Sequence, residues 1–256
     1  MKKNILLTML LLMATMAFAA CTGKKGSTVQ KSTAAQTDTF KTRSGKEIVF
    51  TAIKHGSIRI TFDGREIEVD PVRGLKPPTD YSTYPKADYI FVTHEHFDHC
   101  DTVAIRQLEK PTTVIITNAN CAKIISKGTV MHNGDRLRLA DDIQVDAVPA
   151  YNTTPGKEKY HPKGRDNGFI LTLDGFRVYI SGDTEDIPEM RNIKNIDVAF
   201  LSTNQPFTMT PEQTARAAKF IKPKVLFPYH YSDTHIQKVA DQLKGTGIDV
   251  RIRNYQ

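Results

Sequence analysis

Between residues 94 and 99 the chain reads His-Glu-His-Phe-Asp-His, which places three of its eight histidines and two carboxylates in six positions. Imidazole nitrogens and carboxylate oxygens bind zinc, iron and manganese, so this density predicts a metal site rather than a solvated surface. The apolar run Tyr89–Val92 directly before it predicts a short buried strand. Because side chains alternate along an extended segment, His94 and His96 are expected to point the same way. The candidate ligands therefore lie where a strand ends.

The spacing His-x-His-x-Asp-His after an apolar strand resembles the signature of the metallo-β-lactamase-fold hydrolases. Further candidate residues follow strands in the same order as in that superfamily: Asp70, Gly182-Asp183-Thr184 and His230. The resemblance covers roughly residues 48 to 253 and is similar to the branch of ascorbate-phosphate lactonase-like proteins and uncharacterised metal-dependent hydrolases. It implies an α/β fold, a four-layer αββα sandwich. The motifs that carry the resemblance are specific for the fold and for the metal site, but they say little about the substrate.

The resemblance also implies two divalent metal ions, zinc in the first instance with manganese or iron as alternatives. One ion is expected on His94, His96 and a third nitrogen, and the other on Asp98, His99 and His230. Asp183 and a water are expected to bridge them, and two ions about 3.5–4 Å apart hold a hydroxide ready at neutral pH. Asp98 is the expected catalytic residue, which orients the nucleophile and takes its proton. Asp70 is expected to support the metal-binding loop without being a ligand.

The third nitrogen of the first metal is where the sequence departs from the family pattern. Family members usually carry a histidine near the position of Asn152, and a neutral amide oxygen binds zinc poorly. His161 occurs later in the same loop, so we expect the loop to fold back and supply His161 as the ligand. Asn152 or water remains the alternative. His55, at a turn into an early strand, is left outside the predicted metal shell.

The N-terminus predicts export. Lys2 and Lys3 precede an apolar run that ends in small residues, so residues 1–20 are expected to be a signal peptide. Phe18-Ala19-Ala20-Cys21 resembles a bacterial lipobox, which implies a lipid on Cys21 and a place in the bacterial cell envelope; simple cleavage near Ala19 or Ala20 is the alternative. Polar residues 21–40 are expected to be a flexible tether, and residues 41–256 the hydrolase domain.

Composition narrows the substrate only slightly. The chain has 256 residues and a net charge of +7, of which +4 lies before residue 41, so the domain carries no basic excess that would favour nucleic acid. We expect a small ester, lactone or phosphodiester; Lys163 and Arg165 leave an anionic substrate open. The alternatives are a β-lactamase and a non-catalytic metal-binding lipoprotein. The sequence does not indicate an oligomeric state.

Overall fold

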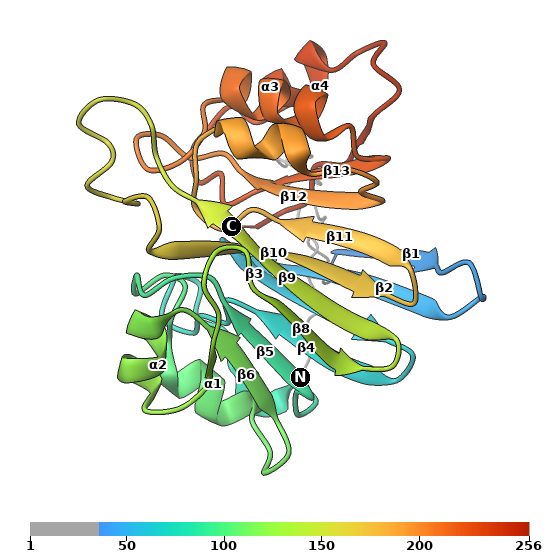
Figure 1. Ribbon diagram of the computed structural model, residues 1–256, viewed down its shortest axis with the longest axis vertical. Helices are drawn as coiled ribbons and strands as arrows, with labels where there is room; N and C mark the ends of the chain where they lie inside the picture. The colour runs from blue at the N-terminus through green and yellow to red at the C-terminus, as the bar shows by residue number, and fades with distance from the viewer. Residues whose placement is uncertain (1–35, 256) are drawn as a thin grey trace, which may run out of the picture. The chain divides into compact units, whose positions relative to one another are not determined.

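The strands of the computed structural model form two seven-stranded mixed sheets, and the model describes residues 36–255 (Figure 1). The expectations for the signal peptide and for Cys21 lie outside the described residues. The first sheet contains, in spatial order, β1 (Gln36–Lys41), β2 (Glu47–Lys54), β3 (Ser57–Phe62), β4 (Arg65–Val69), β5 (Tyr89–Val92), β6 (Val114–Thr117) and β7 (Thr129–Val130). The second contains β14 (Asp249–Val250), β13 (Val225–Tyr229), β12 (Val198–Ser202), β11 (Phe176–Ile180), β10 (Asp166–Leu173), β9 (Ile143–Ala150) and β8 (Arg136–Ala140).

Helices cover the outer faces of both sheets. α1 (Thr102–Leu108) and α2 (Ala119–Ile125) share a buried cluster with β5 and β6 of the first sheet. α3 (Pro211–Ile221) and α4 (Gln237–Gln242) lie beyond β12 and β13 of the second sheet (Figure 1). Two short 3₁₀ helices complete the elements, η1 (Tyr81–Thr83) and η2 (Pro188–Asn192). The expected αββα sandwich is confirmed. Within residues 36–255 no helix combines the length and apolar character needed to cross a bilayer.

The main core lies between the sheets and follows from strand alternation. In β3, Ile58, Ile60 and Phe62 are fully buried, whereas Arg59 and Thr61 between them are partly exposed. The second sheet supplies Val145 of β9 and other apolar residues to the same cluster. Because successive strand residues point to opposite faces, this period-2 pattern fixes which face packs inward.

The first strand corrects the expected domain boundary. β1 begins at Gln36 and pairs antiparallel with β2, so residues 36–40 belong to the sheet and not to a tether. Asp38 explains the difference. Its buried carboxylate accepts hydrogen bonds from Arg253 (2.6 and 2.7 Å) and Arg251 (2.9 Å), which join the strand to the far end of the chain. A polar composition alone could not reveal these pairings.

Turns and helix starts follow local sequence signals. The aspartate-glycine pairs Asp63-Gly64 and Asp174-Gly175, typical of tight hairpin turns, join β3 to β4 and β10 to β11. Thr210 caps α3, and its side chain and that of Gln213 each bond the other's backbone. The strands that matter for function end at one edge of the sandwich. The residues that follow those ends are His55, Asp70, His94 to His99, Asp183 and His230.

Candidate metal centre

Three overlapping groups of potential ligands come together at this edge. His94, His96 and His161 form one, and their ligand atoms lie within 4.8 Å of one another. The second contains His55, Asp98, His99 and His230, and a third group joins His94 and His99 to Asp183. The structure thus brings together all seven residues singled out as ligands from the sequence, although they come from positions 94 to 230.

Asp183 lies at the centre of the cluster. Its Oδ2 is 3.4 Å from Nε2 of His161 and 3.4 Å from Nε2 of His230, and its Oδ1 is 3.4 Å from Nε2 of His99. These three imidazole nitrogens and Oδ1 are buried and have no hydrogen-bond partner within the described residues. Atoms that share a tetrahedral zinc ion, with bonds of 2.0–2.1 Å, lie about 3.3 Å apart. The spacing therefore fits atoms that surround metal ions better than atoms that bond one another.

Hydrogen bonds on the opposite ring nitrogens fix the direction of the lone pairs. Asp70 Oδ2 accepts from Nδ1 of His99 (2.8 Å), and the carbonyl of Phe207 accepts from Nδ1 of His161 (3.1 Å). Thr93 donates its hydroxyl proton to Asp70 and lies 3.0 Å from Nδ1 of His94, so it can only accept from that ring. In each ring Nδ1 is protonated toward its partner, which leaves Nε2 free for a ligand.

Asp70 has the supporting position expected from the resemblance. Besides His99, its carboxylate accepts hydrogen bonds from the backbone N–H and the hydroxyl of Thr93, at 2.8 and 2.7 Å. It is fully buried and its backbone has a left-handed φ of 43°. A single carboxylate thus holds the first residue of the loop and one of its histidines.

Burial and charge set the protonation states of the cluster. Burial lowers the pKa of His94 well below its usual value, that of His161 to about 4 and that of His230 to about 3. Burial would raise the pKa of Asp183, but the imidazoles of His230 and His99 outweigh it and hold that pKa well below its usual value. Burial would lower the pKa of His99, but the carboxylates of Asp183 and Asp70 outweigh it and raise that pKa well above its usual value. Neutral imidazoles and an ionised carboxylate are the forms that bind metals, so an ion bound here would displace the proton of His99.

His161 reaches the cluster because its loop folds back along β9. The backbone N–H of Asn152 donates to the carbonyl of His161 at 2.9 Å. The side-chain amide of Asn152 donates to the carbonyls of Lys157 (3.2 Å) and Phe207 (2.7 Å). Asn152 thus braces the loop that carries His161 and holds the carbonyl that orients the His161 ring.

His55 was missed by the sequence reasoning. Its Nε2 lies 3.0 Å from Oδ2 of Asp98, and its ring centroid lies 3.7 Å from that of His230. The neighbouring residue, Gly56, packs so closely that a Cβ there would lie 2.8 Å from Cε1 of His99. A histidine followed by glycine after a strand was the available signal, but a turn histidine without a role gives the same signal.

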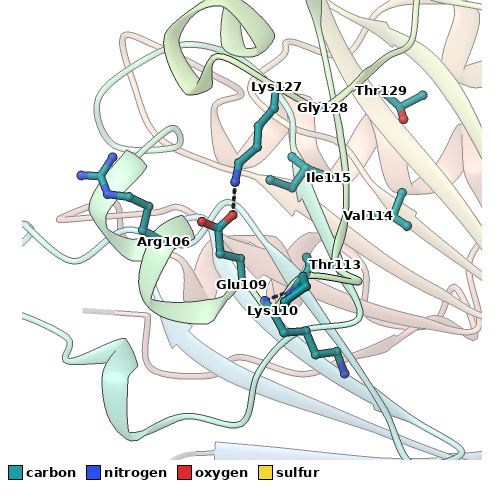
Figure 2. Close-up of a pocket in the computed structure, with 10 residues that line it drawn as sticks. Arg106, Glu109, Lys110, Thr113, Val114, Ile115, Lys127, Gly128 and Thr129 are labelled. Carbon is teal, nitrogen blue, oxygen red and sulfur yellow. Dashed lines mark hydrogen bonds and ion pairs between the residues drawn. The ribbon is translucent and has the colours of Figure 1, made fainter.

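Two cavities help to locate the open side of this site. His55 borders one of about 360 Å³, which Lys54, Leu75, Lys76, Ser232, Asp233 and Tyr255 also line. A larger cavity, of about 690 Å³, includes Val114 and Ile115 and is drawn in Figure 2. Val114 begins β6, whose opposite end leads toward the cluster, and the ion pair of Glu109 with Lys127 crosses the cavity (Figure 2). The larger cavity therefore lies at the end of the sheet opposite the candidate metal ligands, and it is not part of this site.

Comparisons with known proteins agree with this geometry. Residues 29–230 match the family model described as a β-lactamase superfamily domain. A UPF0173 metal-dependent hydrolase from Lysinibacillus sphaericus is 32% identical over 70% of this chain and 82% of its own length. One from Anoxybacillus flavithermus is 30% identical over 77% of this chain and 94% of its own.

Solved structures give the same result. The crystal structure of a putative metal-dependent hydrolase from Parabacteroides distasonis is 57% identical, covers 87% of this chain and 100% of its own, and has a TM-score of 0.84. Igni18, a metallo hydrolase from Ignicoccus hospitalis, is 25% identical, with a TM-score of 0.66 over 81% of this chain and 95% of its own. The chain belongs to the UPF0173 metal-dependent hydrolase family, in the metallo-β-lactamase superfamily.

Proposed function

We propose that this hydrolase holds two divalent metal ions, zinc in the first instance, and cleaves a small ester, lactone or phosphodiester. The observation that carries the proposal is the position of Asp183 among four imidazoles. Its carboxylate lies 3.4 Å from His99, His161 and His230 and 3.9 Å from His94, and no hydrogen bond within the described residues satisfies its Oδ1. A buried acceptor between histidine sets is suited to bridging two ions.

The donor set divides into two shells. His94, His96 and His161 would hold one ion and Asp98, His99 and His230 the other, with Asp183 shared between them. The 3.1 Å between Nε2 of His94 and Nδ1 of His96 supports a common ion, because it is close to the ligand spacing of a tetrahedral site. Imidazole and carboxylate donors suit zinc, with manganese and iron as further candidates.

Bound in this cluster, two divalent ions would lower the pKa of a water and polarise the oxygen of the substrate. The protein's own groups then have distinct tasks. Burial would raise the pKa of Asp98, but its hydrogen bond with His55 and the nearby imidazoles outweigh burial and lower that pKa, so the carboxylate is ionised. It is also partly open to solvent, so it can orient the attacking water and take a proton. His55 holds the Asp98 carboxylate in place.

We also propose an exported lipoprotein. The support is the sequence alone: Lys2 and Lys3 before an apolar segment, and the lipobox-like residues that end at Cys21. Expressed with its natural N-terminus, the protein should fractionate with membranes, and Cys21→Ala should release it to the soluble fraction. An unchanged distribution in the variant would contradict the lipid anchor.

Hydrolysis should be tested with a p-nitrophenyl ester, a lactone and bis-p-nitrophenyl phosphate. We expect turnover of at least one of them, loss of that turnover after chelation, and recovery with zinc or manganese. Asp183→Asn should reduce the rate by at least about 100-fold, since a carboxylate that serves two ions is replaced by a neutral amide. His132→Ala, at an exposed histidine outside the cluster, is the control. Activity that survives both chelation and Asp183→Asn would overturn the proposal.

A further inference from the structure

Aromatic side chains border one side of the metal cluster. Of the five large hydrophobic side chains exposed within residues 36–255, two are phenylalanines, Phe97 (80% exposed) and Phe207 (41%). Phe97 stands between His96 and Asp98 in the chain. Phe207 contacts the cluster through its carbonyl, which accepts the hydrogen bond from His161. Neither side chain is needed to fill the core, so both are available to a ligand.

A third ring extends this surface. Tyr160 precedes His161 and packs edge-on against Phe207, with 5.0 Å between the ring centroids. The rings of His96 and His161 are themselves 4.9 Å apart, so Phe97, which follows His96, and Tyr160, which precedes His161, flank neighbouring rings of the cluster. We call Phe97, Tyr160 and Phe207 the aromatic rim. Exposed apolar groups beside a polar site are typical of ligand-binding surfaces.

The two basic residues that could have favoured an anionic substrate, Lys163 and Arg165, are engaged by carboxylates. Lys163 pairs with Glu189 at 2.9 Å and donates to the hydroxyl of Tyr151. The guanidinium of Arg165 pairs with Asp166 at 2.7 Å and lies 3.1 Å from Glu95. Neither therefore offers an unpaired charge to a phosphate. The ammonium of Lys159 lies against the ring of Tyr160, 5.2 Å from its centroid. The exposed side chains of Phe97 and Phe207 make this side of the site suited to an apolar group.

We infer that the aromatic rim binds the acyl chain of the substrate, so that the enzyme prefers uncharged carboxylic esters or lactones with an aliphatic or aromatic acyl group of four or more carbons. This inference rests on the proposed hydrolytic function and narrows it. The scissile carbonyl would lie over the cluster and the acyl chain across the rim. The cavity beside His55 would face the alcohol part.

The preference can be measured with p-nitrophenyl acetate, butyrate and octanoate. Burying one methylene group fully in an apolar surface increases binding affinity up to about fourfold. On an open rim we expect about half of that free energy, or about twofold per methylene. We therefore expect kcat/KM to rise about 10- to 20-fold from butyrate to octanoate, mainly through KM. In the Phe97→Ala/Phe207→Ala double variant the octanoate-to-butyrate ratio of kcat/KM should fall below about threefold. Val114→Ala, which removes exposed apolar surface at the opposite end of β6, is the matched control.

A binding measurement separates this inference from the proposed function. The metal-free protein should enhance the fluorescence of the neutral dye Nile red, and the double variant but not Val114→Ala should lose that enhancement. Equal dye binding by the wild type and the double variant would contradict the inference that the aromatic rim binds the acyl chain. An unchanged octanoate-to-butyrate ratio would contradict it as well. Faster hydrolysis of bis-p-nitrophenyl phosphate than of octanoate would also overturn it. Absence of all hydrolysis, with dye binding lost in the double variant, would instead contradict the proposed function and retain the rim as an apolar binding surface.

Discussion

The backbone N–H of Asn152 donates a 2.9 Å hydrogen bond to the carbonyl of His161, nine positions later in the chain. The loop between them closes on itself, and His161 is placed 3.4 Å from Asp183. Asn152 thus braces the loop, and the side chain that lies in the cluster comes from the far end of that loop. We propose that His161 supplies the nitrogen donor that the resemblance implies near position 152.

Asp70→Asn tests the support beneath the cluster. The buried Asp70 carboxylate accepts from the backbone and hydroxyl of Thr93 and from His99, and an amide nitrogen in its place would face a donor. A lost partner for a buried donor costs about 1–3 kcal/mol, and loss of an orienting carboxylate typically costs 10- to 100-fold in metal affinity. We expect both effects, measured by urea unfolding of the metal-free protein and by metal titration. Asp135→Asn, at an exposed aspartate, is the control; equal metal affinity of Asp70→Asn and wild type would contradict the supporting role.

Gly56→Ala tests the close approach to His99. The added Cβ would lie 2.8 Å from Cε1 and 3.1 Å from Nδ1 of that ring, so the ring must move away from Asp70 or the strand end must shift. We expect metal affinity and hydrolysis to fall at least about 10-fold, and overpacking to cost about 1–3 kcal/mol of stability. The comparison variant is Gly74→Ala, where a Cβ meets nothing within 4 Å. Two variants with the same metal affinity would show that His99 is not held by packing against Gly56.

Glu68→Gln tests a buried carboxyl outside the cluster. Burial raises the pKa of Glu68 to about 8, and neither of its oxygens has a hydrogen-bond partner within the described residues. Arg59, on the neighbouring strand, is engaged by Glu66 through bonds of 2.7 and 2.8 Å. The folded protein therefore retains this proton while the unfolded chain loses it near pH 4.5, so stability should fall as pH rises from about 4.5 to 8.

The side-chain amide introduced by Glu68→Gln does not titrate, so the stability of this variant should lack that contribution to the pH dependence. The difference in unfolding free energy between variant and wild type should grow with pH by at most about 1.4 kcal/mol per unit, up to about pH 8. Chemical denaturation at pH 5, 6.5 and 8 measures it, and Glu47→Gln at an exposed position serves for comparison. Parallel pH profiles for wild type and Glu68→Gln would rule out a proton held by Glu68.

Features that depend on residues close together in the sequence could be predicted, whereas features that depend on contacts between distant residues could not. The cluster from His94 to His99 is local, and the resemblance to the metallo-β-lactamase fold added Asp183 and His230, which follow strands whose ends meet at the same edge. β1 and His55 were different. The strand at Gln36 is stabilised by Asp38 with arginines more than two hundred positions away, and His55 acquires its partner, Asp98, only through the packing of the sheet. Single-sequence patterns do not contain such pairings.

The helix boundaries differ in the same way in how well the local sequence indicates them. α3 begins at Pro211 as its capping signals indicate, because the capping box and the proline act within one turn. α2 ends at Ile125, where Ser126 adopts a left-handed φ of 62° although the next glycine in the chain is Gly128. Loop geometry around a non-glycine residue decided that boundary, and the sequence carries no distinct signal for it.

The metal content of the purified full-length protein and of its His161→Ala variant tests the central claim most directly. The account predicts about two divalent ions per wild-type chain and about one in the variant, because the shell of His94 and His96 loses its third nitrogen while that of Asp98, His99 and His230 remains. His132→Ala, at the exposed histidine, should keep both ions. Two ions in His161→Ala would contradict the assignment of His161 as a ligand, and wild-type protein that retains no ion would contradict the dinuclear centre itself.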